Sequence, residues 1–444
     1  MQSNPWESLL TRLEIAASRD RFVRHGSDVF LLGDTAWAAF SRATLEEWTA
    51  YLAMRKGQGF NSVYISVLPI AHDRSVSADD RTPFRMYQDG GWDLSAIDLD
   101  YFEQAAHMVE LAVAAGFTPF LVLLWCNYVP DSWGSRLTPE LVLDERQNRS
   151  YLDHVVATFA HLDPVFVISG DDALTGEAAV QRYVDSLEHV KAAAPGCHTT
   201  MHTTPAAIED MRRLTRLPRQ IADAESLGFY SFQSGHDGDY IRRTWDLTEH
   251  YLDLAIRRPI INMEPCYEGI GHFATGARHG AKAVRHASWS SILSGAAAGL
   301  GYGAHGVWSW HRRGDRYTNE SKFGPPFSVD EAIRFRGAQD VGLLRWIVES
   351  HNLFGLRPRH DLLVTDPPGV RVGATENLAT IGVYAPFAYP IAIGADCMGY
   401  KLTSWDLVSR ERYEASVTHH RDSLEIGLPG FNGDALHVIE TTPQ

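Results

Sequence analysis

The stretch "PIINMEPCYEGIG" (259–271) begins like a buried strand and ends like part of a functional site. Four of the five residues before Glu264 are apolar, Pro265 follows it, and a second acid, Glu268, comes four residues later. A short apolar run bounded by a proline is typical of a strand buried in a protein core. The pattern predicts a strand over 259–265 that carries Glu264 at its carboxyl end.

Seven further strand candidates recur in the first 310 residues, separated by segments with helical spacing. The segment 43–59 has a Thr N-cap with an acid three residues on, and 98–116 and 175–196 carry apolar stripes. Eight strands alternating with helices predict an α/β fold. A closed (β/α)8 TIM barrel is favoured over an open sheet, because no GxGxxG or GxxxxGK[ST] follows the first strand. The seven other candidates are 28–34, 61–69, 117–125, 164–171, 198–204, 227–234 and 299–308.

The composition changes near residue 355, where strand-like, turn-rich sequence without a convincing helix begins. This part predicts a small antiparallel β-sandwich. We therefore expect two domains, a (β/α)8 barrel over 1–354 and a β-sandwich accessory domain over 355–444.

Charge and composition exclude several classes of partner. The 40 basic and 55 acidic residues give a net charge of −15, which repels phosphate backbones and argues against a nucleic-acid partner. No apolar run approaches the roughly 20 residues that span a bilayer, so no membrane partner is expected. The N-terminus has no visible signal peptide, which predicts a cytoplasmic protein, with a removed leader left open. Four isolated cysteines argue against disulfides and structural zinc.

In a (β/α)8 barrel, the working groups lie at the carboxyl ends of the strands. Asp171 follows the fourth predicted strand and Glu264 ends the seventh. Glycoside hydrolysis requires two opposed carboxyl groups, one that acts as the acid and one that acts as the nucleophile. Asp172 competes with Asp171 as the acid/base, but adjacent acids point apart, and Asp172 or Thr175 could cap the following helix. We expect Glu268 to have a supporting role.

Aromatic and polar side chains gather at nearly every other strand end. Aromatic faces beside hydrogen-bonding groups suit sugars, and the histidines there would donate to sugar hydroxyls. We expect no cofactor and no metal, because no HExxH spacing or third ligand is evident, and no GxSxG elbow favours an esterase. The residues at these ends are Asp34, Trp37, Trp125, His202, Gln233, His236, Tyr267, His305 and Trp308.

Several stretches together resemble the apiosidase-like glycoside hydrolases, a (β/α)8 family commonly followed by a small β-domain. The chain differs from the family's usual pattern at Met201–Thr203, at Ser169 and in the doubled acid at 171–172. The matching stretches, in order, are "FLLGDTAWAAF", "ATLEEWTAYLAMRKGQGFNSVYISVLP", "VISGDD", "TMHTTP", "SFQSGH", "INMEPCYEGIG" and "ASWSSILSGAAAGLGYGAHGVWSW".

The resemblance implies a retaining glycosidase with Asp171 as acid/base and Glu264 as nucleophile. It also implies a sugar pocket lined by the strand-end residues named above. We expect exo action on short glycosides, with furanosides such as apiose or arabinose as candidates from the family. The main alternative is a non-catalytic carbohydrate-binding barrel, and a metal-dependent hydrolase is a third. The oligomeric state stays open, a homo-oligomer included.

Overall fold

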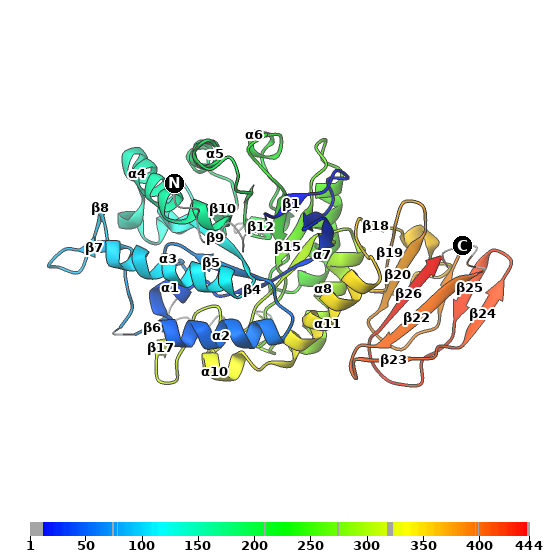
Figure 1. Ribbon diagram of the computed structural model, residues 1–444. Helices are drawn as coiled ribbons and strands as arrows, with labels where there is room; N and C mark the ends of the chain where they lie inside the picture. The colour runs from blue at the N-terminus through cyan, green and yellow to red at the C-terminus, as the bar shows by residue number, and fades with distance from the viewer. Residues whose placement is uncertain are drawn as a thin grey trace.

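The computed structural model describes residues 12–72, 75–77, 79–207, 210–272, 275–317, 323–395, 397 and 399–441. The first eleven residues, on which the signal-peptide prediction partly rests, lie outside this range. Figure 1 shows a barrel at the blue-to-yellow part of the chain, with orange and red antiparallel sheets beside it.

The barrel consists of eight parallel strands in the described part of the chain. Every strand coincides with a run predicted from the sequence, although β4 ends one residue beyond the run 28–34 and the run 198–204 forms a strand at only two residues. The order in the sheet is β11-β10-β9-β5-β4-β16-β15-β14, as sequence-adjacent strands pair in a TIM barrel. The strands are β4 (Leu31–Thr35), β5 (Ser62–Ser66), β9 (Thr118–Trp125), β10 (Val165–Gly170), β11 (Thr199–Thr200), β14 (Tyr230–Gln233), β15 (Ile260–Glu264) and β16 (Gly299–Tyr302).

The two ends of this sheet, β11 and β14, meet through a few hydrogen bonds rather than a full ladder. The backbone N–H of Gly228 donates to the carbonyl of Thr199 at 3.0 Å. The Thr200 hydroxyl donates to the Phe229 carbonyl at 2.9 Å. The barrel is therefore nearly closed, and its strand ends converge on one rim.

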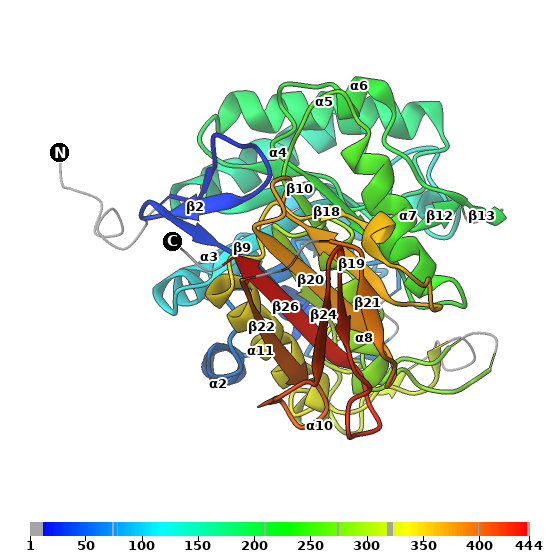
Figure 2. The ribbon, with the colours of Figure 1, turned by 90° about the vertical axis from the view of Figure 1, so that its right-hand side faces the viewer.

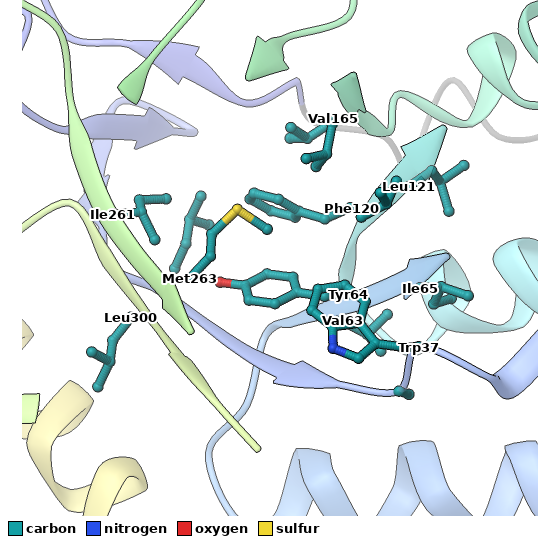
Figure 3. Packing of buried hydrophobic residues seen from close by; sticks show 14 of the residues in the cluster. Trp37, Val63, Tyr64, Ile65, Phe120, Leu121, Val165, Ile261, Met263 and Leu300 are labelled. Carbon is teal, nitrogen blue, oxygen red and sulfur yellow. The ribbon is translucent and has the colours of Figure 1, made fainter. Parts of the chain in front are cut away.

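Large apolar and aromatic side chains fill the barrel. Tyr64, Phe120 and Met263 meet between the strands in Figure 3, and the Tyr64 and Phe120 ring centroids are 4.8 Å apart. Gly33 makes room for this packing, because a Cβ there would stand 2.2 Å from the Tyr64 ring. All five residues of β15 up to Glu264 are buried, which is why the run reads as apolar.

Helices cover the outside of the barrel (Figure 1). The predicted Thr44 cap is confirmed as a capping box, in which Thr44 and Glu47 each accept from the other's backbone N–H. The helices are α1 (Ala39–Arg42), α2 (Leu45–Gly57), α3 (Leu99–Ala114), α4 (Glu145–Phe159), α5 (Glu177–Ala193), α6 (Arg219–Ala222), α7 (Tyr240–Leu252), α8 (Ala281–Leu293), α10 (Val329–Ala332) and α11 (Arg336–Ser350). None of the helices in the described ranges has both the length and the apolar character needed to cross a membrane.

Short strands outside the barrel decorate its loops. A three-stranded N-terminal sheet contains β1 (Glu14–Ile15), β2 (Phe22–Arg24) and β3 (Ser27–Val29). The pair β6 (Ser75–Val76) with β17 (Arg316–Tyr317) joins the loops after the second and eighth barrel strands. Two further antiparallel pairs are β7 (Phe84–Met86) with β8 (Trp92–Ile97) and β12 (Ala206–Ala207) with β13 (Asp210–Leu214).

The predicted C-terminal β-sandwich is present as two antiparallel sheets with a hydrophobic core of their own. The larger sheet lies against α8 and α11 of the barrel domain (Figures 1 and 2). Its strands, in order, are β18 (Arg357–Pro358), β19 (Arg371–Ala374), β20 (Thr380–Ala385), β26 (Ala435–Thr441), β22 (Tyr400–Asp406) and β23 (Glu411–Tyr413). The smaller sheet contains β21 (Ile391–Ile393), β25 (Ser423–Ile426) and β24 (Val417–His420).

Candidate active site

A cavity of about 520 Å³ opens at the carboxyl-end rim of the barrel. It brings together residues from strands that are far apart in the sequence. Eight of the eleven predicted site residues line it, namely Trp37, Trp125, Asp171, Gln233, His236, Glu264, Tyr267 and Trp308. The opposed pair of acids expected from the sequence thus faces one shared cavity.

Glu264 lies at the end of β15 with two histidines against its carboxylate. His236 Nε2 is 3.0 Å from Oε1, and His202 Nε2 is 3.2 Å from Oε2. Burial by itself would raise the pKa of Glu264, but the contacts from His202 and His236 outweigh it and hold the pKa below its usual range. Glu264 is therefore an ionised carboxylate at neutral pH.

The backbone beside Glu264 fixes the tautomer of His236. The Tyr267 backbone N–H donates to His236 Nδ1 at 3.2 Å, so a neutral ring carries its hydrogen on Nε2, the atom that faces Glu264. Trp37 Nε1 in turn donates to the Tyr267 hydroxyl at 2.9 Å. Burial and the charge of Glu264 raise the pKa of Tyr267 well above its usual value. These contacts fix the positions of His236 and Tyr267 beside Glu264.

Asp171 follows the end of β10 and also lines the cavity. Its backbone is left-handed, with φ of 52°, and is held by its own N–H to the His202 carbonyl at 3.1 Å. Trp133 Nε1 donates to the Asp171 carbonyl at 2.6 Å. The side-chain amide of Gln233 donates to Oδ1, and His72 Nε2 contacts Oδ2. Both carboxyl oxygens thus have a fixed partner.

Asp172 points away from the cavity. Its Oδ1 accepts from the Leu174 backbone N–H at 3.0 Å and its Oδ2 from the Tyr183 hydroxyl at 3.0 Å. Burial raises the pKa of Asp172 to about 6, against the effect of these hydrogen bonds. A raised pKa alone would favour it as an acid, but a general acid must first reach the substrate. Neither Asp172 nor Thr175 caps α5, whose N-cap is Gly176 without a side-chain bond.

Asp34 does not line the cavity, contrary to the expectation from the sequence. Its Oδ2 accepts from Arg55 Nε at 2.7 Å and from the Tyr51 hydroxyl at 2.6 Å, and both partners lie on α2. The side chains of Asp34 and Arg55 are fully buried. The pair joins the first barrel strand to its covering helix, so its role is structural.

His305 and His202 also differ from the expectation that they donate to sugar hydroxyls. His305 Nε2 is 2.9 Å from the Gly324 carbonyl, and its Nδ1 accepts from Trp308 Nε1 at 3.1 Å. Burial lowers the pKa of His305 to about 4, so the ring is neutral and serves to orient Trp308. His202 is fully buried and faces Glu264.

Glu268 has the supporting role expected for it. Its Oε2 accepts from the Tyr302 hydroxyl at 2.7 Å and from the Gly337 backbone N–H at 2.8 Å. Both contacts lie beneath the rim, where Glu268 ties the eighth strand to α11.

Sequence reasoning missed His72 and Trp133, which both contact Asp171. His72 lies six residues past β5, at the one barrel strand for which no rim residue was proposed. Arg243 on α7 and Asp237 also line the cavity, where Arg243 Nη1 binds both oxygens of Asp237 at 2.8 Å. No group of three or more His, Cys, Asp or Glu among the described residues is placed to hold a metal ion.

Solved structures with a similar fold are glycoside hydrolases by their descriptions. One, described as a glycoside hydrolase, has a TM-score of 0.76 at 15% identity, covering 99% of this chain and 98% of its own. A glycoside hydrolase family 5 protein from Bacteroides vulgatus has a TM-score of 0.74 at 16% identity, and the match covers 98% of this chain and 94% of that protein. A family 5 mannosidase from Rhizomucor miehei has a TM-score of 0.52 at 10% identity, and the match covers 77% of this chain and 99% of that protein. At such identities the likeness shows the fold.

The sequence itself identifies the family. No curated protein sequence matches the chain. Residues 17–355, however, match the family model described as "Apiosidase-like, catalytic domain", which covers most of the chain and the whole barrel from β4 to β16. The resemblance seen in the sequence motifs is thereby confirmed, and the protein belongs to the apiosidase-like family of glycoside hydrolases.

Proposed function

We propose that the protein is a retaining, exo-acting glycoside hydrolase in which Glu264 is the nucleophile and Asp171 the acid/base. The observation that carries the proposal is the contrast between two carboxyl groups on one cavity. Glu264 is held ionised by His202 and His236, as a nucleophile must be. Asp171 contacts a histidine and an amide that leave one of its oxygens able to hold a proton.

In the first step, Asp171 donates its proton to the glycosidic oxygen as the bond from that oxygen to the anomeric carbon breaks. Glu264 forms a covalent bond to the same carbon, and the alcohol leaves. His236 Nε2 donates to Oε1 at 3.0 Å and His202 Nε2 lies 3.2 Å from Oε2, so lone pairs of the carboxylate stay free for the attack.

In the second step, Asp171 acts as a base. It takes a proton from a water molecule whose oxygen bonds to the anomeric carbon, and the bond to Glu264 breaks. The sugar leaves with its original anomeric configuration, and Asp171 is protonated again for the next cycle.

The walls of the cavity favour a short, neutral glycoside. A volume of about 520 Å³ is in the range of sites for small ligands, and Trp37, Trp125 and Trp308 offer ring faces to a sugar. The acidic side chains of Asp239 and Glu264 line the same cavity, whereas the guanidinium of Arg243 is already held by Asp237. This balance of charge disfavours acidic sugars. The family makes furanosides such as apiose or arabinose the first candidates.

A panel of nitrophenyl pyranosides and furanosides tests the activity, and proton NMR of the first-formed product tests retention. With the best substrate, Glu264→Ala and Asp171→Ala are each compared with Glu411→Ala, which changes an exposed acid on β23. We expect kcat to fall by at least about 10⁴-fold in Glu264→Ala, and Glu411→Ala to match the wild type. Near-normal turnover by Glu264→Ala, or a product of inverted configuration, would refute the assignment.

The division into domains at 354/355 is part of the proposal and agrees with the gap between α11 and β18. The cytoplasmic location and the oligomeric state stay predictions.

A further inference from the structure

The two oxygens of Asp171 have different partners, and this difference has a chemical consequence. The Gln233 amide nitrogen donates to Oδ1, and an amide NH₂ group has no lone pair with which to accept. Oδ1 is therefore always the acceptor. If Asp171 acts as an acid, its proton must sit on Oδ2.

Oδ2 is the oxygen that His72 Nε2 contacts. The contact is sheltered, since the side chain of Asp171 is 13% exposed and that of His72 is 30% exposed. The His72 ring packs against Trp133 with 5.0 Å between centroids, and its edge meets Trp125 at 6.2 Å. The His72 ring is therefore packed against two tryptophan rings where its Nε2 contacts Oδ2.

The neighbouring acids are turned away from this pair. Asp172 faces Tyr183 and Leu174, and Glu264 faces His202 and His236. His72 is therefore the titratable side chain in direct contact with the oxygen that must hold the proton.

We infer that His72 shares the catalytic proton with Asp171 and is a positioning residue for general acid/base catalysis; this inference rests on the proposed function. Before the first step the proton lies between Asp171 Oδ2 and His72 Nε2. It passes to the glycosidic oxygen as the C–O bond breaks and Glu264 bonds to the anomeric carbon. In the second step Asp171 Oδ2 takes one proton from the attacking water, which restores the pair.

The test compares two glycosides of the sugar that the panel identifies, one with p-nitrophenol and one with methanol as the leaving group. Nitrophenolate leaves without a proton, whereas methanol requires one. We expect His72→Ala to lower kcat for the methyl glycoside by about 10²-fold with little change in KM. For the nitrophenyl glycoside we expect a loss in the first step within about threefold.

Two further variants separate proton sharing from simple orientation. His72→Gln keeps a hydrogen-bond donor near Oδ2 but cannot exchange a proton, so it should be as impaired on the methyl glycoside as His72→Ala. In an Asp171→Asn background, His72→Ala should cause no additional loss, because the two residues act as one unit. His189→Gln is the matched control, since His189 Nε2 contacts Asp153 at 2.7 Å on the surface between α4 and α5.

Three results would overturn the inference: wild-type kcat in His72→Gln, equal loss on both glycosides, or independent losses in the double variant. Failure of the proposed function has a different signature. In that case Asp171→Asn would itself retain turnover of the methyl glycoside.

Discussion

The side-chain amide of Gln233 donates to Oδ1 of Asp171, while the backbone of Gln233 pairs in register with Glu264. One residue on the sixth barrel strand thus touches both carboxyl-bearing strand ends. This link, together with the barrel, helps to fix the position of the proposed acid/base Asp171 relative to the proposed nucleophile Glu264. Gln233, which the sequence analysis assigned to substrate binding, thus also supports the two proposed catalytic residues.

Replacing Gln233 should therefore impair catalysis more than binding. In Gln233→Leu the donor to Asp171 Oδ1 is lost, and the carboxyl group can rotate away from the glycosidic oxygen. We expect kcat to fall by about 10- to 100-fold, because small misplacements of a catalytic group have effects of this size. Steady-state kinetics on the best nitrophenyl glycoside measure this change in kcat. Gln220→Leu, at an exposed position on α6, is the control. A rise in KM with unchanged kcat would contradict the prediction.

The eight barrel strands could be predicted from the sequence because they are buried on both faces and therefore read as short apolar runs. That Asp171 and Glu264 line one cavity could also be predicted, because the carboxyl ends of barrel strands meet at one rim. Glu264 and Asp171 each lie at the carboxyl end of such a buried strand. The motifs around them indicated the family.

Asp34 and His72 show why other parts of the site could not be predicted. The partner of Asp34 is Arg55 on α2, so only the folded barrel reveals that the Asp34 side chain faces the helix layer. His72 was overlooked because it reaches Asp171 from a loop, and no local sequence pattern predicts the path of that loop.

The buried pair of Asp34 and Arg55 should contribute to stability and not to catalysis. Removing one partner leaves a buried charge without its counterion, so Arg55→Met should lower the free energy of unfolding by about 3–5 kcal/mol. Guanidinium unfolding monitored by tryptophan fluorescence measures this. Arg242→Met, which breaks an exposed ion pair with Asp246 on α7, should cost less than about 1 kcal/mol. A similar loss of unfolding free energy in both variants would contradict the structural role of the buried pair.

The two histidines at Glu264 predict a pH dependence. The pKa of Glu264 is lowered, so its ionised form persists as the pH falls from neutral to below the ordinary glutamate range. His236→Ala removes one of the contacts that lower this pKa. The acid limb of the kcat/KM profile should therefore move to higher pH in that variant. His107→Ala, at an exposed site on α3, should leave the limb in place. An unchanged acid limb in His236→Ala would show that His236 does not stabilise the carboxylate.

Trp125 should act as a hydrogen-bond donor to the sugar. Its Nε1 is buried, its ring lines the cavity, and this nitrogen has no partner within the part of the chain that the structure describes. Trp125→Phe keeps a ring but removes the donor. We expect kcat/KM to fall by about tenfold, the effect of one hydrogen bond of typical strength. Trp346→Phe, at an exposed position on α11, serves as the control. Full activity in Trp125→Phe would mean that Nε1 does not contact the substrate.

A buried charge network should hold the β-sandwich against the barrel. Arg285 on α8 binds both oxygens of Asp434 at 2.7 Å, just before β26, and its Nη1 binds Asp340 on α11 at 2.7 Å. Both carboxylates are fully buried, so Arg285→Met leaves two of them without this cation. We expect the free energy of unfolding to fall by about 3–5 kcal/mol. Limited proteolysis should then release a barrel fragment.

The control for this interface is Arg359→Met, which breaks a surface pair with Asp361 in the sandwich domain. It should change neither the unfolding midpoint nor the proteolysis pattern, because exposed pairs contribute little. The kcat of Arg285→Met, measured well below its unfolding transition, should stay near the wild-type value, since Arg285 does not line the cavity and contacts the sandwich. If Arg285→Met unfolds at the same denaturant concentration as the wild type, the two domains are held together by the apolar packing of Trp405, Leu436 and Val438 on the barrel domain instead.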